Sequence, residues 1–334
     1  MKAIRLRHPA SYDNLRLEDL PAPPPGPGEI SVRIRAASLN FRDMLVANGV
    51  FPTFDGIVPL SDGAGEVTAV GPGVSEFAIG DAVVSTFHPN WRDGHVERSE
   101  NNASPGGPAD GYAAQMVTRS TAHFTLAPRG LSHAEAATLT CAGVTAWRAL
   151  ANGPIRPGQT VLVEGTGGVS LFALQFAKAA GALVIATSSS TTKLERLQAL
   201  GADHVVNYRE TEKWGEAVLA LTGGLGVDHV IEVGGPHSLP QSLAAARTGG
   251  HVAIIGATGG FDIDTIPFAI VQAKRLRLQG VTVGSRRDQT DMIRAIEANG
   301  IRPVIDRTFP LEGLADAFRY LESGGHFGKI VIEL

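Results

Sequence analysis

The chain has 334 residues, of which 43% are hydrophobic and 19% charged, and its 29 Lys and Arg against 33 Asp and Glu give a formal net charge of -4. This length predicts about two domains. The slight acidic excess argues against a nucleic-acid binder, and the single cysteine excludes an internal disulfide or a zinc site built from several thiolates. No apolar stretch reaches the roughly 18 residues of a membrane span and the start lacks the apolar core of a signal peptide, so we expect a cytoplasmic protein that binds neither membrane nor nucleic acid.

Short strands separated by turns are predicted for about the first 125 residues. The segment EISVRIRAAS alternates, with Ile30, Val32 and Ile34 on one face and charged side chains on the other. The segments GAGEVTAVGPGV, GDAVVSTF and AAQMVTRS are further short apolar runs bounded by turn residues. The polar stretch at 88–110 predicts a long loop, which together with Trp91 we expect to line a substrate cleft.

From residue 132 the pattern changes to alternating helices and strands. SHAEAATLTCAGVTAWRALA predicts one helix, with Ser132 and Glu135 spaced as a capping box. Six apolar strands follow, at QTVLVEG, ALVIATS, HVVNY, VDHVIEVGG, GHVAIIG and LRLQGVTVG, and helices are predicted at 169–180, 192–200, 211–221 and 238–247. Buried strands spaced by helices indicate an α/β fold with a doubly wound, six-stranded parallel sheet, the dinucleotide-binding (Rossmann) fold.

The C-terminal tail predicts elements outside that sheet. They are a helix at 288–299, a strand at 307–309, a helix at 311–323 and a last strand at 329–334. Because the last strand exceeds the count of six, we expect it to return to the first domain. The predicted organisation is therefore one domain from 1–130 with 286–334, and a dinucleotide-binding domain at 131–285.

A glycine-rich turn follows the first strand of the predicted parallel sheet. That strand ends at Glu164, and a helix begins a few residues later. Backbone amides at such a helix N-terminus can bind a diphosphate if no Cβ blocks the approach. The third glycine position of the fingerprint holds Ser170, but the strand–turn–helix context supports the assignment. The residues predicted to contact the cofactor here are Gly165, Thr166, Gly167, Gly168 and Val169.

The end of the second strand distinguishes the two nicotinamide cofactors. NAD-binding proteins usually carry a carboxylate there, whereas this chain has Ser188 and Ser189, with Lys193 and Tyr208 further on. Hydroxyl groups and a cation suit the 2′-phosphate of NADP(H). The alternative is that Lys193 is a solvated helix residue and Tyr208 a boundary aromatic. We expect NADP(H).

Over nearly its whole length the chain resembles the medium-chain dehydrogenase/reductase superfamily. The signature of its first domain resembles GAGEVTAVGPGV followed by GDAV. The helix that enters its cofactor domain resembles CAGVTAWRAL. The resemblance implies that the first domain is a chaperonin-10-like (GroES-like) β-barrel. It also implies that Asn40 faces the nicotinamide ribose, Thr145 lies beside the nicotinamide and Lys329 lies near the cofactor phosphates. We also expect Gly256, at the end of the strand GHVAIIG, to bind the cofactor.

The zinc ligands of the alcohol dehydrogenases in that superfamily are largely missing. Asn40 stands in place of the catalytic cysteine and Ser61-Asp62 in place of a His-Glu pair, so only the third ligand survives, as Cys141. One thiolate is too few, since zinc needs at least three protein ligands. We therefore expect no metal. The chain resembles the zinc-free branch, which contains quinone oxidoreductases and enoyl reductases. Cys141 lies on an apolar helix and is expected to be inert.

Without zinc, an alcohol is hard to activate, whereas a quinone or conjugated carbonyl is already electrophilic. We therefore expect NADPH-dependent reduction of such a small molecule, with Asn40 and Arg42 as polarising groups and Asp43 orienting them. A structural ion pair between Arg42 and Asp43 is the alternative. Two other functions remain open: a zinc-free alcohol or carbonyl dehydrogenase, and a non-catalytic, crystallin-like NADPH-binding protein. LRLQGVTVGS, as an apolar edge strand, predicts a homodimer.

Overall fold

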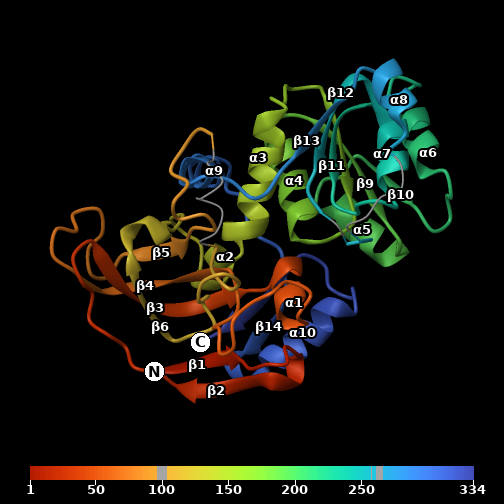
Figure 1. Cartoon of the computed structure of the whole chain (residues 1–334). Helices are drawn as coiled ribbons and strands as arrows, with labels where there is room; N and C mark the ends of the chain where they lie inside the picture. The colour runs from red at the N-terminus through yellow and green to blue at the C-terminus, as the bar shows by residue number, and fades with distance from the viewer. Residues whose placement is uncertain (96–103, 257, 261–265) are drawn as a thin grey trace. The chain divides into compact units, whose positions relative to one another are not determined.

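The computed structural model in Figure 1 describes residues 1–95, 104–256, 258–260 and 266–334. The chain divides into two compact units, one formed by Met1–Val144 with Val283–Leu334 and the other by Thr145–Thr282. Residues 131–144 were expected in the dinucleotide-binding domain but lie with the first unit. The reason is that helix α2 (His133–Ala137) packs on two strands of the first unit, β3 (Glu29–Ser38) and β4 (Asp62–Val70). No described helix is both long and apolar enough to cross a membrane.

The first unit is built on a seven-stranded sheet with the order β14-β15-β3-β4-β5-β7, where β6 also pairs with β3. A separate hairpin is formed by β1 and β2. The strand bounds are β1 Lys2–Leu6, β2 Leu15–Asp19, β3 Glu29–Ser38, β4 Asp62–Val70, β5 Ala82–Ser85, β6 Met116–Ser120, β7 Phe124–Leu126, β14 Ile305–Pro310 and β15 Lys329–Glu333. Val331 of β15 lies opposite Ser38 of β3, so the expected return of the last strand to the first unit is confirmed.

Helices cover parts of this unit, and its core contains the predicted alternating face of β3. Ile30, Val32 and Ile34 are all buried there, beside Phe318 of the C-terminal helix. The helices are α1 Phe41–Ala47, α2 His133–Ala137, α9 Arg286–Asn299 and α10 Leu314–Glu322. α1 begins at the residue after Asn40, which places Asn40, Arg42 and Asp43 around one helix N-terminus.

The segment from 132 onward is interrupted, so the prediction of one helix was wrong. Its capping box is present: the Glu135 amide donates to Ser132 Oγ (3.2 Å) and the Ser132 amide to Glu135 Oε2 (2.7 Å). α2 nevertheless ends at Ala137, a π-helical turn occupies Leu139–Gly143, and α3 (Val144–Asn152) follows. The Thr138 hydroxyl donates to the carbonyl of Glu135 three residues earlier, a local bond of the kind that bends helices. The Thr140 hydroxyl donates instead to the carbonyl of Ser85, at the end of β5.

The second unit is a parallel sheet of six strands in the order β10-β9-β8-β11-β12-β13, which is the doubly wound order 3-2-1-4-5-6. The expected fold class is confirmed. Figure 1 shows α6, α7 and α8 on one side of the sheet and α3 and α4 on the other. The bounds are β8 Thr160–Glu164, α4 Gly168–Ala179, β9 Leu183–Ser188, α5 Thr191–Ala199, β10 His204–Asn207, α6 Trp214–Leu221, β11 Val227–Glu232, α7 Leu239–Ala245, β12 Ala246–Ile254, α8 Phe268–Ala273 and β13 Arg277–Gly280.

The outer strand β13 supports the expectation of a homodimer. It pairs only with β12 among the described strands, and Phe268 on the preceding helix α8 is 73% exposed, with Ile266 close by in sequence at 45%. An edge with unpaired backbone groups beside exposed apolar side chains favours pairing with a second copy. We expect at least a dimer in size-exclusion light scattering at micromolar concentration. A monomeric mass there would contradict this prediction.

Candidate functional site

The glycine-rich turn between β8 and α4 has the geometry of a diphosphate site. Gly165 has a φ of 71°, a conformation that favours glycine. Gly167, the N-cap of α4, has an ordinary φ of −77°, and a Cβ built on it would meet no protein atom within 4 Å. Neither strain nor packing therefore explains the glycine at 167, whereas close approach of a ligand to the helix N-terminus does.

The serine at the third fingerprint position has a structural explanation. Ser170 is buried, and its hydroxyl donates to the carbonyl of Glu164 at 2.6 Å. It therefore fastens the first turn of α4 to the end of β8, which keeps strand and helix close without a third glycine. The residues of the turn fit a dinucleotide.

The residues predicted around the 2′-phosphate come together at the ends of β9 and β10. Ser188 is the last residue of β9, and the Tyr208 amide donates to its carbonyl at 3.2 Å. Ser190 caps α5 by accepting from the Lys193 amide at 3.4 Å, which places Lys193 in the first turn of that helix. Ser188 is buried, Ser189 and Lys193 are half-buried and Tyr208 is 41% exposed. Two adjacent strand ends thus carry the predicted hydroxyls and cation.

Thr145 and Gly256 belong to the same unit. Thr145 is buried in α3. A Cβ on Gly256 would lie 2.2 Å from the Val233 carbonyl oxygen. Close packing of two backbones after β11 and β12 therefore already requires glycine at 256. The prediction that Gly256 binds cofactor stays a prediction.

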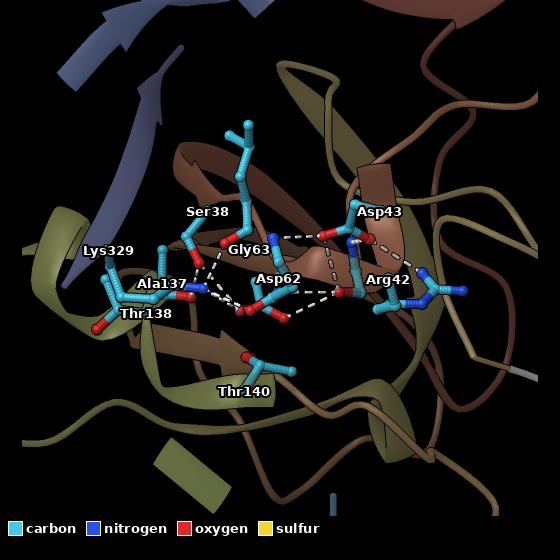
Figure 2. Close-up of polar contacts among 12 residues, drawn as sticks. Ser38, Arg42, Asp43, Asp62, Gly63, Ala137, Thr138, Thr140 and Lys329 are labelled. Carbon is cyan, nitrogen blue, oxygen red and sulfur yellow. Dashed lines mark hydrogen bonds and ion pairs between the residues drawn. The ribbon is translucent and has the colours of Figure 1, made fainter. Parts of the chain in front are cut away.

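In the first unit, Lys329 is the centre of a buried polar cluster. Its Nζ donates to Leu39 O (2.6 Å) and Asn40 Oδ1 (2.5 Å) and lies 3.7 Å from Asp62 Oδ2. Ser38 Oγ donates to the same Asp62 oxygen at 2.9 Å. Figure 2 shows Lys329 and Ser38 converging on Asp62. Lys329 is 3% exposed, so its ammonium is enclosed, with the Asp62 carboxylate as a counter-charge.

Asn40 is oriented by this cluster. An ammonium only donates hydrogen bonds, so the atom of Asn40 that faces Lys329 is the amide oxygen. The amide nitrogen Nδ2 then points the other way and donates to Ser61 Oγ at 3.2 Å. Hydrogen bonds in series polarise one another, and the Lys329 charge therefore strengthens Asn40 Nδ2 as a donor.

Arg42 and Asp43 form an ion pair. A structural ion pair was the alternative to the expected role of Arg42 in polarising the substrate. Arg42 Nη1 donates to Asp43 Oδ1 (3.0 Å) and to the carbonyls of Pro105 (2.9 Å) and Gly106 (3.2 Å). Asp43 Oδ2 accepts from the backbone amide of Asn40 at 2.9 Å. Burial raises the pKa of Asp43, against the opposite effect of Arg42. These contacts fasten the 105–106 segment to the start of α1.

Trp91 was expected to line a cleft, and the structure contradicts this. Its side chain is 1% exposed and Nε1 donates to the Gly94 carbonyl at 3.1 Å. The backbone carbonyl of Trp91 accepts from Arg286. Trp91 therefore anchors the start of the polar loop in the interior of its unit, because its large apolar surface gains more from burial. Part of that loop, residues 96–103, lies outside the described residues.

Three interacting residues were missed by the sequence reasoning. Glu164 ends β8, Glu232 ends β11, and the hydroxyl of Ser242 on α7 contacts a carboxyl oxygen of both. The available signal was an acidic residue at the end of two apolar strands, since neighbouring parallel strands end at the same edge of a sheet. Ser38, which contacts Asp62, was also not predicted. Its place at the end of a strand was the only feature of the sequence that could have indicated it.

Comparison with known proteins matches this chain to dehydrogenase family profiles, to a dehydrogenase-like relative and to part of a larger synthase. The family profile described as alcohol dehydrogenase GroES-like domain matches residues 26–129, and the one described as zinc-binding dehydrogenase matches residues 168–298. A zinc-type alcohol dehydrogenase-like protein of Schizosaccharomyces pombe is 41% identical, over 97% of this chain and 96% of its own length. A phthioceranic/hydroxyphthioceranic acid synthase of Mycobacterium tuberculosis is 33% identical over 99% of this chain and 15% of the synthase.

Solved structures match over the whole chain. A Sinorhizobium meliloti protein assigned as an alcohol dehydrogenase has 42% identity and a TM-score of 0.94, with 98% of that protein covered. An NAD-dependent alcohol dehydrogenase has 38% identity and a TM-score of 0.91 over its full length. A crotonyl-CoA carboxylase/reductase in complex with NADP has 26% identity and a TM-score of 0.87, with 95% covered.

The residues at the positions of the zinc ligands do not fit a zinc ion. They are Asn40, Ser61 and Cys141, and Lys329 places a positive charge beside the first of them. Desolvation, and then the nearby Asp62 carboxylate, raise the pKa of the Cys141 thiol, which opposes the thiolate that zinc binds. Among residues 1–95, 104–256, 258–260 and 266–334, no group of three or more His, Cys, Asp or Glu side chains could hold a metal.

We expect the purified protein to contain no stoichiometric zinc. Two of the three ligand positions carry an amide and a hydroxyl, and an ammonium would repel the cation. Elemental analysis checks this directly. About one zinc per chain, together with loss of activity on chelation, would contradict the prediction.

Proposed function

Because the chain belongs to the medium-chain dehydrogenase/reductase superfamily, we propose that it is an NADPH-dependent, zinc-independent reductase. Its substrate is a quinone or a compound whose C=C bond is conjugated with a carbonyl group. The observation that carries this proposal is the buried Lys329–Asp62–Asn40 cluster. A metal that could lower the pKa of an alcohol does not fit there, whereas an oriented amide donor is present.

The chemistry follows from what these groups can do. Bound cofactor supplies a hydride, and the protein must hold the acceptor carbon next to it and stabilise charge on the acceptor oxygen. Asn40 Nδ2 is a neutral donor strengthened by Lys329. A neutral donor suffices for the oxygen of an enolate or a hydroquinone anion, because the corresponding enol and hydroquinone are far stronger acids than an alcohol. Lys329 acts through Asn40 and is a positioning residue. The turn at 165–169 holds the cofactor diphosphate.

Relatives support this substrate class to different degrees. Crotonyl-CoA is an α,β-unsaturated thioester, and the reductase named for it was solved with NADP. The alternative, a zinc-free alcohol or carbonyl dehydrogenase, is favoured by the NAD-dependent alcohol dehydrogenase of 38% identity. The two proposals differ in the bond that is reduced, C=C or C=O.

The test is a substrate panel of quinones, enones, enoyl thioesters and aldehydes, each assayed with NADPH and with NADH. We expect turnover of a quinone or an enone with NADPH, and a saturated ketone as the product from the enone. Reduction at the carbonyl group, or turnover of aldehydes alone, would support the alcohol dehydrogenase alternative. Tight NADPH binding without turnover of any member would support a non-catalytic, crystallin-like protein.

A further inference from the structure

Two buried carboxyl groups meet at the carboxyl edge of the parallel sheet. Glu164 ends β8 and Glu232 ends the neighbouring strand β11. Ser242 Oγ, on α7, is within hydrogen-bonding distance of Glu164 Oε1 and of Glu232 Oε2. All three side chains are buried, with exposed fractions of 5%, 0% and 0% for Glu164, Glu232 and Ser242. None of them has a role in the proposed hydride transfer.

The hydrogen atoms available to these contacts are too few if both carboxyl groups are ionised. A serine hydroxyl has one hydrogen and can donate to one carboxyl oxygen only. If both groups were ionised, the second oxygen would face a lone pair of Ser242 Oγ at hydrogen-bonding distance. Two adjacent carboxylates in a buried site would also repel each other strongly. A proton on one of the two groups removes both conflicts.

The remaining contacts identify Glu164 as the protonated group. Glu232 Oε1 accepts from the amides of Gly234 (2.8 Å) and Gly235 (2.9 Å) and from Ser238 Oγ (2.5 Å). Three donors on one oxygen stabilise a carboxylate. Glu164 Oε2, in contrast, is buried and has no hydrogen-bond partner among the described residues, which suits the carbonyl oxygen of a neutral acid.

We propose that Glu164 is a positioning residue that keeps its proton at neutral pH and donates it to Ser242, whose own hydroxyl donates to Glu232. The relay leaves one negative charge, on Glu232, whose carboxylate accepts from the amides and the hydroxyl of the turn at 234–238 after β11. Glu164 directly precedes Gly165. Because Glu164 is neutral when protonated, it adds no second negative charge next to the turn that holds the cofactor diphosphate. This last consequence rests on the proposed function, whereas the protonation itself does not.

The electrostatic surroundings support the assignment. Burial, and then the charge of Glu232, raise the pKa of Glu164 well above its usual range; a side-chain hydrogen bond with Glu232 raises it further, and the Ser242 hydroxyl and Val233 amide oppose these effects. Glu232 is the last residue of β11, Val233 follows it, and Ser242 lies on α7. On β9, the residue in register with Glu164 is Thr187, which does not titrate. From α4, Ser170 contacts only the backbone carbonyl of Glu164.

The experiment compares urea unfolding of the wild type and Glu164→Gln without cofactor, between about pH 5 and 8. The folded wild type holds a proton that the unfolded chain releases, so its stability falls as pH rises through this window. The variant carries a neutral amide that can donate to Ser242, and it lacks this slope. We expect the ratio of unfolding constants, wild type over variant, to rise up to tenfold per pH unit.

Glu212→Gln, at an exposed carboxylate on the same unit, is the matched control and should leave the ratio constant. A constant ratio for Glu164→Gln would overturn the proposal. Failure of Glu164→Gln to fold would overturn it too, because glutamine reproduces the shape and the donor of a protonated glutamate.

Infrared difference spectra of wild type minus Glu164→Gln give a second measurement. They should show the C=O band of a protonated carboxyl at pH about 7, and its absence would count against the proposal. The subtraction removes any contribution from the buried Asp43.

NADPH titration of the two proteins is a separate measurement. Above neutral pH, where the folded wild type begins to lose the Glu164 proton beside the turn, affinity should fall with rising pH more steeply in the wild type than in the variant. Absence of NADPH binding in both proteins would reject the proposed function and leave the protonation result standing.

Discussion

Gly167→Val should abolish most cofactor binding while leaving the protein folded. In the free protein a Cβ at 167 meets no atom within 4 Å and φ is −77°, so we expect a stability loss of about 1 kcal/mol, from replacing a good N-cap residue. With cofactor, the added side chain occupies the space through which the diphosphate reaches the amides of α4. Affinity for NADPH and NADH should both fall by roughly a hundredfold, or about 2.7 kcal/mol.

Two other glycines are the controls for this experiment. Gly280→Ala, at a second glycine with open space and no positive φ, should leave the affinity for both cofactors unchanged. Gly165→Ala should lose stability by about 1–2 kcal/mol, because φ is 71° there. The measurements are fluorescence titration with each cofactor and thermal unfolding. If Gly167→Val keeps the wild-type affinity for both cofactors, the glycine-rich turn is not the diphosphate site.

The parallel sheet could be predicted because its signal is local and repeated. Each strand is a short apolar run and most of the intervals have helical periodicity, although α8, between β12 and β13, was not predicted. The strand order is that of the doubly wound fold to which six such strands were assigned. The predicted helices at 169–180 and 192–200 differ from α4 and α5 by about one residue at each end. The interruption between α2 and α3 was not predicted; within it the Thr140 hydroxyl donates to the carbonyl of Ser85, a residue 55 positions away that no local pattern places nearby.

The candidate site was predictable where it depends on single positions along the chain, and not where it depends on contacts. Absence of zinc ligands could be predicted from Asn40 and Ser61. That an ammonium lies beside Asn40 could not, because Lys329 is 289 residues distant and reaches it only through the pairing of β15 with β3. Arg42 was ambiguous for the same reason, since the two carbonyls that bind its guanidinium belong to residues 105 and 106.

Lys193→Ala should weaken NADPH binding about ten- to hundredfold and leave NADH binding nearly unchanged. Lys193 lies in the first turn of α5, beside the ends of β9 and β10, where the adenosine ribose binds in this fold. The substitution removes a charge-assisted hydrogen bond to the 2′-phosphate, typically worth 1.5–3 kcal/mol, and NADH has no phosphate there. Arg209, which is exposed and directly follows Tyr208, is a second cation at this edge, so Arg209→Ala is a companion variant with a weaker expected effect.

Ser188→Asp should reverse the preference between the two cofactors. A carboxylate at the end of β9 repels the 2′-phosphate and accepts hydrogen bonds from the ribose hydroxyls of NADH. Because Ser188 is only 3% exposed, Ser189→Asp, at the half-buried neighbour, serves as the control that separates charge from loss of packing. The measurement is the ratio of kcat/KM for NADPH and NADH in the wild type and each variant, with thermal unfolding alongside. A wild type that prefers NADH, or a Lys193→Ala variant that weakens both cofactors equally, would show that Ser188, Ser189, Lys193 and Tyr208 do not form the phosphate pocket.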